Sequence, residues 1–258
     1  MRSTAAEHTG SAGGGSFRLA GRAGVLSVAL GVAGLILDQM WTFPATGATG
    51  ADVARFVDAH RPALLLAMVL NACVVGLWLV FGAGIWRWLR DSTAGESDLS
   101  TCFLVGLVSF VTLLLAGFTS FFLLVYRAPE ASDPRLLYDF GFALLAISGV
   151  PTALALGAYA THAFRDARLP TWSTWIATVA ALAHLLLLCS LVIRSGFFSL
   201  TGGVTIAIPG TLFAWILATS VLLLRQSGVE PDALTPATSG TKKRPLVKTR
   251  RAQAESHP

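Results

Sequence analysis

Apolar residues dominate six long stretches of the chain, and polar residues gather between them. The stretches run over residues 22–43, 62–86, 101–126, 139–163, 171–193 and 204–225. A bilayer core about 30 Å thick requires about 20 residues of helix, because each residue advances a helix by about 1.5 Å. Every stretch meets that length. The pattern therefore predicts an all-α fold, a polytopic membrane bundle of six transmembrane helices over residues 18–226.

The first apolar stretch is distinct from a secretory signal peptide. It runs from Ala23 to Phe43, whereas the apolar core of a signal peptide has roughly 7–15 residues and precedes a small-residue cleavage site. No such site follows this stretch directly. We therefore expect a retained helix.

A polar and apolar pattern of helical period precedes the second stretch, in the sequence GADVARFVDAHRP. One face carries Val53, Phe56 and Val57, and the other carries Asp52, Arg55 and Asp58. This pattern predicts a short amphipathic helix on the outer surface of the membrane. It serves either as an ordinary structured connection or as a cap that captures a ligand.

Small residues recur every four positions on three of the predicted helices. The stripes are Ala23, Ser27 and Gly31; Gly149, Ala153 and Gly157; and Gly210, Ala214 and Ala218. Small side chains let helix backbones approach closely in lipid, so the stripes predict tight helix contacts. Pro151 and Pro209 are expected to kink their helices.

Charge bears on topology and partners. Charged residues make up 13% of the chain, against about 25% in soluble proteins. Nearly all of them lie outside the apolar stretches, since a charge at a helix centre costs about 2.5–3.5 kcal/mol on insertion scales. The net charge of +5 is therefore a topology signal.

The charge pattern also bears on partners. No basic stripe with interleaved aromatic residues accompanies the positive charge, so no nucleic-acid partner is predicted. The lipid bilayer is the expected partner.

Arginine and lysine near the helix ends predict the orientation. With the N-terminus inside, the cytoplasmic side holds Arg18, Arg22, Arg87, Arg90, Arg165, Arg168 and Arg225, followed in the tail by Lys242, Lys243 and Arg244. The outer side holds Arg55, Arg61, Arg127, Arg135 and Arg194. The excess of positive charge inside predicts two cytoplasmic termini. Arginine far outnumbers lysine and alanine is abundant, which suggests a GC-rich bacterial genome, and hence a multi-pass protein of the inner (plasma) membrane.

The two ends of the chain have little to bury. Residues 1–17 are rich in Gly, Ser and Thr, and residues 227–258 contain the basic run KKRPLVKTRR. Both segments are expected to be disordered and cytoplasmic. The basic run serves either as a solvated tail that reinforces the orientation or as a contact for anionic lipid headgroups.

No motif predicts catalysis, a metal or a cofactor. The chain contains no Walker sequence, no zinc-protease helix and no nucleophile elbow. Its three cysteines, Cys73, Cys102 and Cys189, form neither a disulfide framework nor a zinc pattern. A haem between His162 and His184 is excluded because these residues fall at different depths of their helices.

Three polar residues within the apolar stretches are the candidate site. From the midpoints of their helices, Asp38 lies roughly 9 Å outward, Asn71 roughly 4–5 Å and His184 roughly 3 Å. Polar and ionisable residues at such positions are functional candidates. The depths predict one polar, ligand-binding cluster in the outer half of the bundle. In the alternative, Asp38 lies near the headgroups and His184 makes one interhelical hydrogen bond.

Several segments resemble a known group of membrane proteins. They are FRLAGRAG at the first helix, DAHRPALL before the second, the Arg165–Asp166 exit, RLPTWSTW and the final WILATSVLLLRQ. Together these segments resemble uncharacterised actinobacterial six-helix integral membrane proteins, a domain-of-unknown-function family. The resemblance spans about residues 17–226, and it implies a fold but no activity.

Two functions of different class follow from these observations. The first is a non-enzymatic accessory or structural membrane component, and the second is a small transporter or channel with an outer-half polar pocket. An intramembrane enzyme ranks third, because it normally needs paired acids, a metal site or a nucleophile with a base. A water-accessible cavity that reaches Asp38 and His184 would favour transport, and a closed core would favour the first function.

Overall fold

The computed structural model describes residues 12–38, 40–45, 47–92, 97–127, 133–166 and 169–226. Its helices are α1 (Ala12–Asp38), α2 (Gly50–Ser92), α3 (Ser97–Arg127), α4 (Pro134–Ile147), α5 (Gly149–Arg165), α6 (Thr171–Leu186), the 3-10 helix η1 (Leu187–Leu191) and α7 (Val204–Gln226). Across these ranges no strand is present, and six helical stretches are long and apolar enough to cross a membrane. Helices α4 and α5 form one of these spans together. The predicted all-α bundle of six spans is confirmed.

Helix α1 begins at Ala12, earlier than the predicted start at residue 18. Extending an existing helix fixes one residue for each hydrogen bond gained, so even a Gly-rich turn can join it. Residues 1–11 and 227–258 lie outside the described residues. The predictions of disordered termini and of a lipid-binding basic tail fall largely on them and stay predictions.

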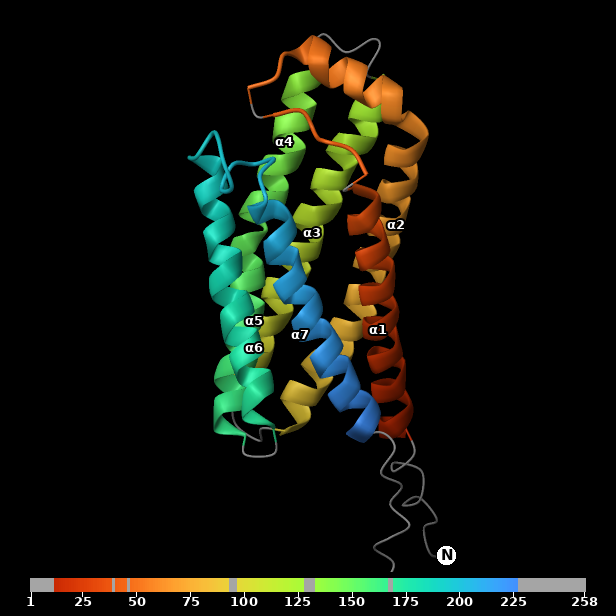
Figure 1. The fold of residues 1–258 in the computed structure, drawn as a ribbon. Helices are drawn as coiled ribbons and strands as arrows, with labels where there is room; N and C mark the ends of the chain where they lie inside the picture. The colour runs from red at the N-terminus through yellow and green to blue at the C-terminus, as the bar shows by residue number, and fades with distance from the viewer. Residues whose placement is uncertain are drawn as a thin grey trace, which may run out of the picture. The chain divides into compact units, whose positions relative to one another are not determined.

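The spans pack in chain order and close into a ring (Figure 1). Helix α1 packs on α2, α2 on α3, and α3 on both α4 and α5; α5 then packs on α6, α6 on α7, and α7 on α1. Helices α2 and α6 are therefore not neighbours in the ring. Each span therefore directs one of its faces toward the central axis of the ring.

Two halves of this ring are distinguished below. The start of α1, the end of α2, the end of α5 and the end of α7 lie at one end, which defines the proximal half (Figure 1). The end of α1, the start of α2, the start of α4 and residues 187–203 lie at the other end, which defines the distal half.

Large apolar side chains cover the outward faces of the spans. Leu66 on α2, Val105 on α3 and Leu182 on α6 are each more than half exposed. A soluble protein rarely exposes apolar surface so widely. Together with the length of the spans, this surface indicates contact with a lipid bilayer and a multi-pass membrane protein.

The amphipathic segment before the second span is helical, as predicted, but it is continuous with that span. Val53 and Val57 are buried, whereas Arg55 and Asp58 are exposed. The apolar face packs on residues of α3 and α4, and the helix bends on its way into the bundle (Figure 1). Pro62 lies inside α2, and its missing N–H and its ring favour a bend without ending the helix.

The fourth span is interrupted at Ser148, shortly before Pro151. A proline has no N–H for the carbonyl four residues earlier, so the helix is weakened one turn ahead of it. Hydroxyl groups bond the carbonyls around the break: Ser148 Oγ donates to Leu145 at 2.7 Å, and Thr152 Oγ1 donates to Ser148 at 2.8 Å. Pro209 lies inside α7 without ending it.

The small-residue stripes correspond only partly to helix contacts. A Cβ atom built on Gly31 would lie 2.6 Å from the Phe213 ring, and one on Gly149 would collide with the His184 carbonyl. The prediction is wrong at Gly157 and Gly210, where an added Cβ would have no neighbour within 4 Å. Helix α7 instead turns its large residues, such as Phe213, into the ring.

In the proximal half, the backbones of α3 and α5 approach each other closely. A Cβ on Gly106 would lie 2.7 Å from both the Ala155 nitrogen and the Pro151 oxygen. Only glycine lets the two backbones meet at this distance.

Candidate functional site

A cavity of about 250 Å³ lies inside the distal half of the ring. Residues of α1, α2, α3, α4, α6, η1 and α7 line it, together with Phe43 from the connection between α1 and α2. Most of these side chains are aliphatic or aromatic, and none of the described residues in the lining is Asp, Glu, Lys or Arg. As far as its lining is described, the cavity is therefore an apolar chamber without charged side chains.

The cavity is long and narrow. Its lining on α2 extends from Leu64 to Trp78, a separation of about 21 Å along the helix axis. On α3 it extends from Phe110 to Val125, about 22 Å. The two helices give the same length independently, so the volume of about 250 Å³ is distributed along a tube.

Aromatic residues close the distal end of this tube. Phe43 packs against Phe56 of α2, with ring centroids 5.4 Å apart, and against Phe142 of α4 at 6.0 Å. Tyr138 of α4 donates a hydrogen bond from its hydroxyl group to the Pro44 carbonyl at 2.9 Å. These contacts fasten the connection between α1 and α2 over the cavity.

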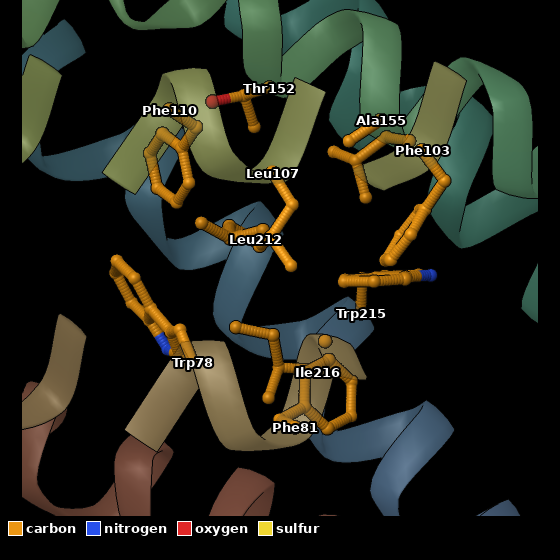
Figure 2. A pocket seen from close by; sticks show the side chains of 12 residues that line it. Trp78, Phe81, Phe103, Leu107, Phe110, Thr152, Ala155, Leu212, Trp215 and Ile216 are labelled. Atoms are coloured by element: carbon orange, nitrogen blue, oxygen red, sulfur yellow. The ribbon is translucent and has the colours of Figure 1, made fainter. Parts of the chain in front are cut away.

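A second aromatic layer closes the proximal end. Trp78 stacks on Phe110, with centroids 5.4 Å apart and ring planes at 26°, and lies 6.0 Å from Phe213. On the other side of this layer is a small cavity of about 30 Å³ (Figure 2), which shares Trp78, Phe110 and Leu212 with the large one. Figure 2 shows side chains of α2, α3, α5 and α7 meeting around that space. Thr152 contributes the one hydroxyl group of its described lining.

His184 brings a buried hydrogen-bonding atom to the large cavity. The residue is 3% exposed, and its Nδ1 lies 2.7 Å from the Ala180 carbonyl of the same helix. A carbonyl oxygen only accepts, so Nδ1 carries the proton and the neutral ring presents the lone pair of Nε2. Among the described residues the structure records no partner for Nε2.

Other polar groups border the same space. The ring of Trp78 also lines it, but its Nε1 is fully buried without a partner among the described residues and does not face the cavity. The side chain of Asn71 lies next to Gly34 of α1 and also lines the cavity. Ser148 and Thr205 line it too, but their hydroxyl groups already donate to the carbonyls of Leu145 and Gly202. Donors and acceptors with free capacity at the cavity wall are therefore concentrated at Asn71 and His184.

Of the three residues predicted to form one cluster, two border this cavity. Asn71 projects from α2 and His184 from α6, so the cavity separates them, and no hydrogen bond joins them directly. Asp38 is the last residue of α1, and its side chain lies outside the described residues. Its place in the cluster stays a prediction.

Trp78 and the aromatic closure were not part of the predicted site. Trp78 follows Asn71 by two helical turns, so the two share a face of α2. That spacing was the one available signal. The closure by Phe43 and Tyr138 depends on which helices are neighbours, and helix period does not determine that.

The proximal half contains polar residues as well, within a packed core, where Trp215 Nε1 and Ser220 Oγ are buried without a partner among the described residues. The hydroxyl groups of Tyr159 and Ser173 are 3.3 Å apart, and Thr219 donates to the Trp215 carbonyl at 2.8 Å. His162 packs edge-on against Trp88 with ring centroids 5.5 Å apart. In the described part of the chain, no group of three or more His, Cys, Asp or Glu side chains could hold a metal ion.

No family model, curated protein or solved structure matches the chain. The six apolar spans establish a multi-pass membrane protein, and the cavity is the feature of its interior that can accept a ligand.

Proposed function

We propose that the protein is a non-enzymatic membrane component that holds a small, uncharged molecule in its distal cavity. The observation that carries the proposal is a cavity of about 250 Å³ inside a closed ring of helices. Protein interiors are close-packed, with few voids larger than a water molecule. An engineered apolar cavity of about 150 Å³ is enough to admit benzene. The distal cavity is therefore large enough for an organic ligand.

The sequence led us to expect a non-enzymatic accessory or structural component. Ligand binding gives such a component a specific task. Side chains that only hold helices together have no need of a chamber on the bundle axis. The uncharged lining favours a neutral molecule, because a buried charge needs a partner to offset its desolvation. Hydrogen-bonding groups at Asn71 and His184 then orient the ligand within an apolar site.

A second candidate is a small transporter or channel that uses the same chamber. Two observations favour it: the large cavity reaches His184, and the small cavity beyond Trp78 and Phe110 continues along the same axis. Transport would require this aromatic layer to open. Release of a loaded solute from proteoliposomes would support this second candidate over retention of a bound ligand.

The proposal includes an orientation. Both termini are placed in the cytoplasm of a bacterial cell, with the distal half toward the outside of the plasma membrane, as the arginine distribution and the resemblance to actinobacterial six-helix proteins suggest. Reporter fusions after Ser97 and after Thr46 test it. A cytoplasmic signal at Ser97 and an external signal at Thr46 are expected, and the reverse pattern would overturn the orientation.

Ligand retention is tested by comparing three purified proteins. Ala67 is buried in the lining of α2, whereas Ala116 of α3 is exposed on the outside of the ring. Ala67→Phe narrows the cavity, and Ala116→Phe adds the same ring to the outer face. Molecules extracted from each protein are identified by mass spectrometry. A compound retained by the wild type and Ala116→Phe, and lost from Ala67→Phe, is the expected result. Identical extracts from all three proteins would contradict the proposal.

A further inference from the structure

We infer that the ligand of the distal cavity is a single-chain amphiphile, one unbranched hydrocarbon chain ending in an uncharged hydroxyl group. The inference rests on the proposed function, since it requires that the cavity hold a ligand. It follows from the shape of the cavity, from the absence of charged side chains in its described lining and from two polar groups.

The shape selects a single extended chain. The cavity is about 21 Å long between the levels of Leu64 and Trp78, and its volume is only about 250 Å³. A tube of these proportions accepts one chain lying parallel to the helices. Two chains side by side, as in a phospholipid, or a broad ring system would need a wider chamber.

The lining selects an apolar chain and a neutral head group. Phe118, Phe121 and Leu64 are typical of its distal part, where contact with methylene groups is the favourable interaction. No described lining residue carries a charge that could pair with a phosphate or an ionised carboxylate. Such a head group would lose its hydration without compensation.

Two side chains select a hydroxyl group over a plain alkane. His184 Nε2 accepts a hydrogen bond, and the Asn71 amide both donates and accepts. His184 is more than nine-tenths buried. A hydroxyl group donates one hydrogen bond and accepts others, so it can satisfy groups of both kinds. An alkane would leave them without partners, at a cost.

The test measures saturable binding of labelled dodecanol and labelled dodecane to the full chain in nanodiscs. His184→Phe keeps an aromatic ring but removes the acceptor, and His184→Gln restores a side-chain acceptor. Ala67→Phe blocks the tube, and Ala116→Phe is the matched control on the outer face. Thermal unfolding of every variant verifies that it is folded.

We expect dodecanol to bind more tightly than dodecane. Loss of one ordinary hydrogen bond should weaken dodecanol binding by about tenfold in His184→Phe, leave dodecane unchanged and be largely reversed in His184→Gln. Ala67→Phe should abolish binding of both probes, and Ala116→Phe should bind as the wild type does.

Two outcomes overturn different statements. If the wild type and His184→Phe bind dodecanol and dodecane equally well, the cavity holds an apolar molecule but the hydroxyl head group is wrong. If Ala67→Phe and Ala116→Phe behave alike toward both probes, the proposed function fails together with the inference.

Discussion

The two halves of this helical ring use similar residues to opposite effect. In the proximal half, Gly106 brings two backbones into contact, and Tyr159 and Ser173 pair their hydroxyl groups in a packed core. In the distal half, the same spans surround a cavity of about 250 Å³ in which His184 retains a free acceptor. The proximal half thus serves as the support, and the distal half carries the site.

The difference in packing between the two halves arises from the side chains that each half directs toward the axis of the ring. In the proximal half, Gly82 of α2 leaves space that the side chain of Leu107 of α3 fills. In the distal half, aromatic side chains from α1–α2, α3 and α4 meet edge to face and leave the axis free.

The largest expected effect comes from the backbone contact of the proximal half. Gly106→Leu adds side-chain atoms where a first Cβ is already 2.7 Å from the backbone of α5, so we expect a loss of about 3 kcal/mol in the free energy of unfolding. Gly157→Leu is the matched control, since an added Cβ has no neighbour within 4 Å there. Its expected change is below about 0.5 kcal/mol. Thermal unfolding in detergent measures both, and equal losses would remove the distinction between packed and open positions.

A smaller effect is expected from the distal closure. Tyr138→Phe removes the hydrogen bond to the Pro44 carbonyl, which should cost about 1 kcal/mol and speed proteolysis between α1 and α2. Tyr126→Phe provides the control because Tyr126 is exposed on α3. If the two variants were cleaved at the same rate, the connection would not be held by this bond.

The smallest effect is expected on the distal surface. Arg135 and Asp139 form an exposed i,i+4 ion pair on α4 with an N–O distance of 3.2 Å. Exposed pairs of this kind contribute little, so Arg135→Ala should change the free energy of unfolding by less than about 0.5 kcal/mol. Denaturation at low and high salt measures it. A larger loss would mean that this surface supports the cavity.

The elements of the fold were predictable because apolar length and helix period are local properties. Val53 and Val57 were assigned to the apolar face of an amphipathic helix from spacing alone, and the structure buries both on one face of a helix, although that helix continues into the second span. The junction at Pro62 was not predicted, since proline is compatible with either a bend or an end. Asn71 and His184 were placed at similar depths, and both border the cavity.

The cavity itself was not predictable from the chain. It depends on the order of helices around the ring and on the size of the side chains that meet on the axis. Gly157 illustrates the limit: its spacing from Gly149 and Ala153 indicated a helix contact, but the structure leaves space around it. Which face of a helix meets a neighbour is a tertiary property, and three small residues in a row do not determine it.

One pair of variants tests the contrast between the halves most directly. Ala67 of α2 borders the distal cavity, and Ala177 of α6 is fully buried in the core. The substitutions Ala67→Phe and Ala177→Phe add the same phenyl ring at the two places, and thermal unfolding measures the stability of each variant. We expect Ala67→Phe to be unchanged or more stable by about 1 kcal/mol, because the ring gains contacts inside the cavity. Ala177→Phe should lose about 2 kcal/mol through overpacking. Equal destabilisation of the two variants would show that the distal half is as tightly packed as the proximal half, and would contradict the account.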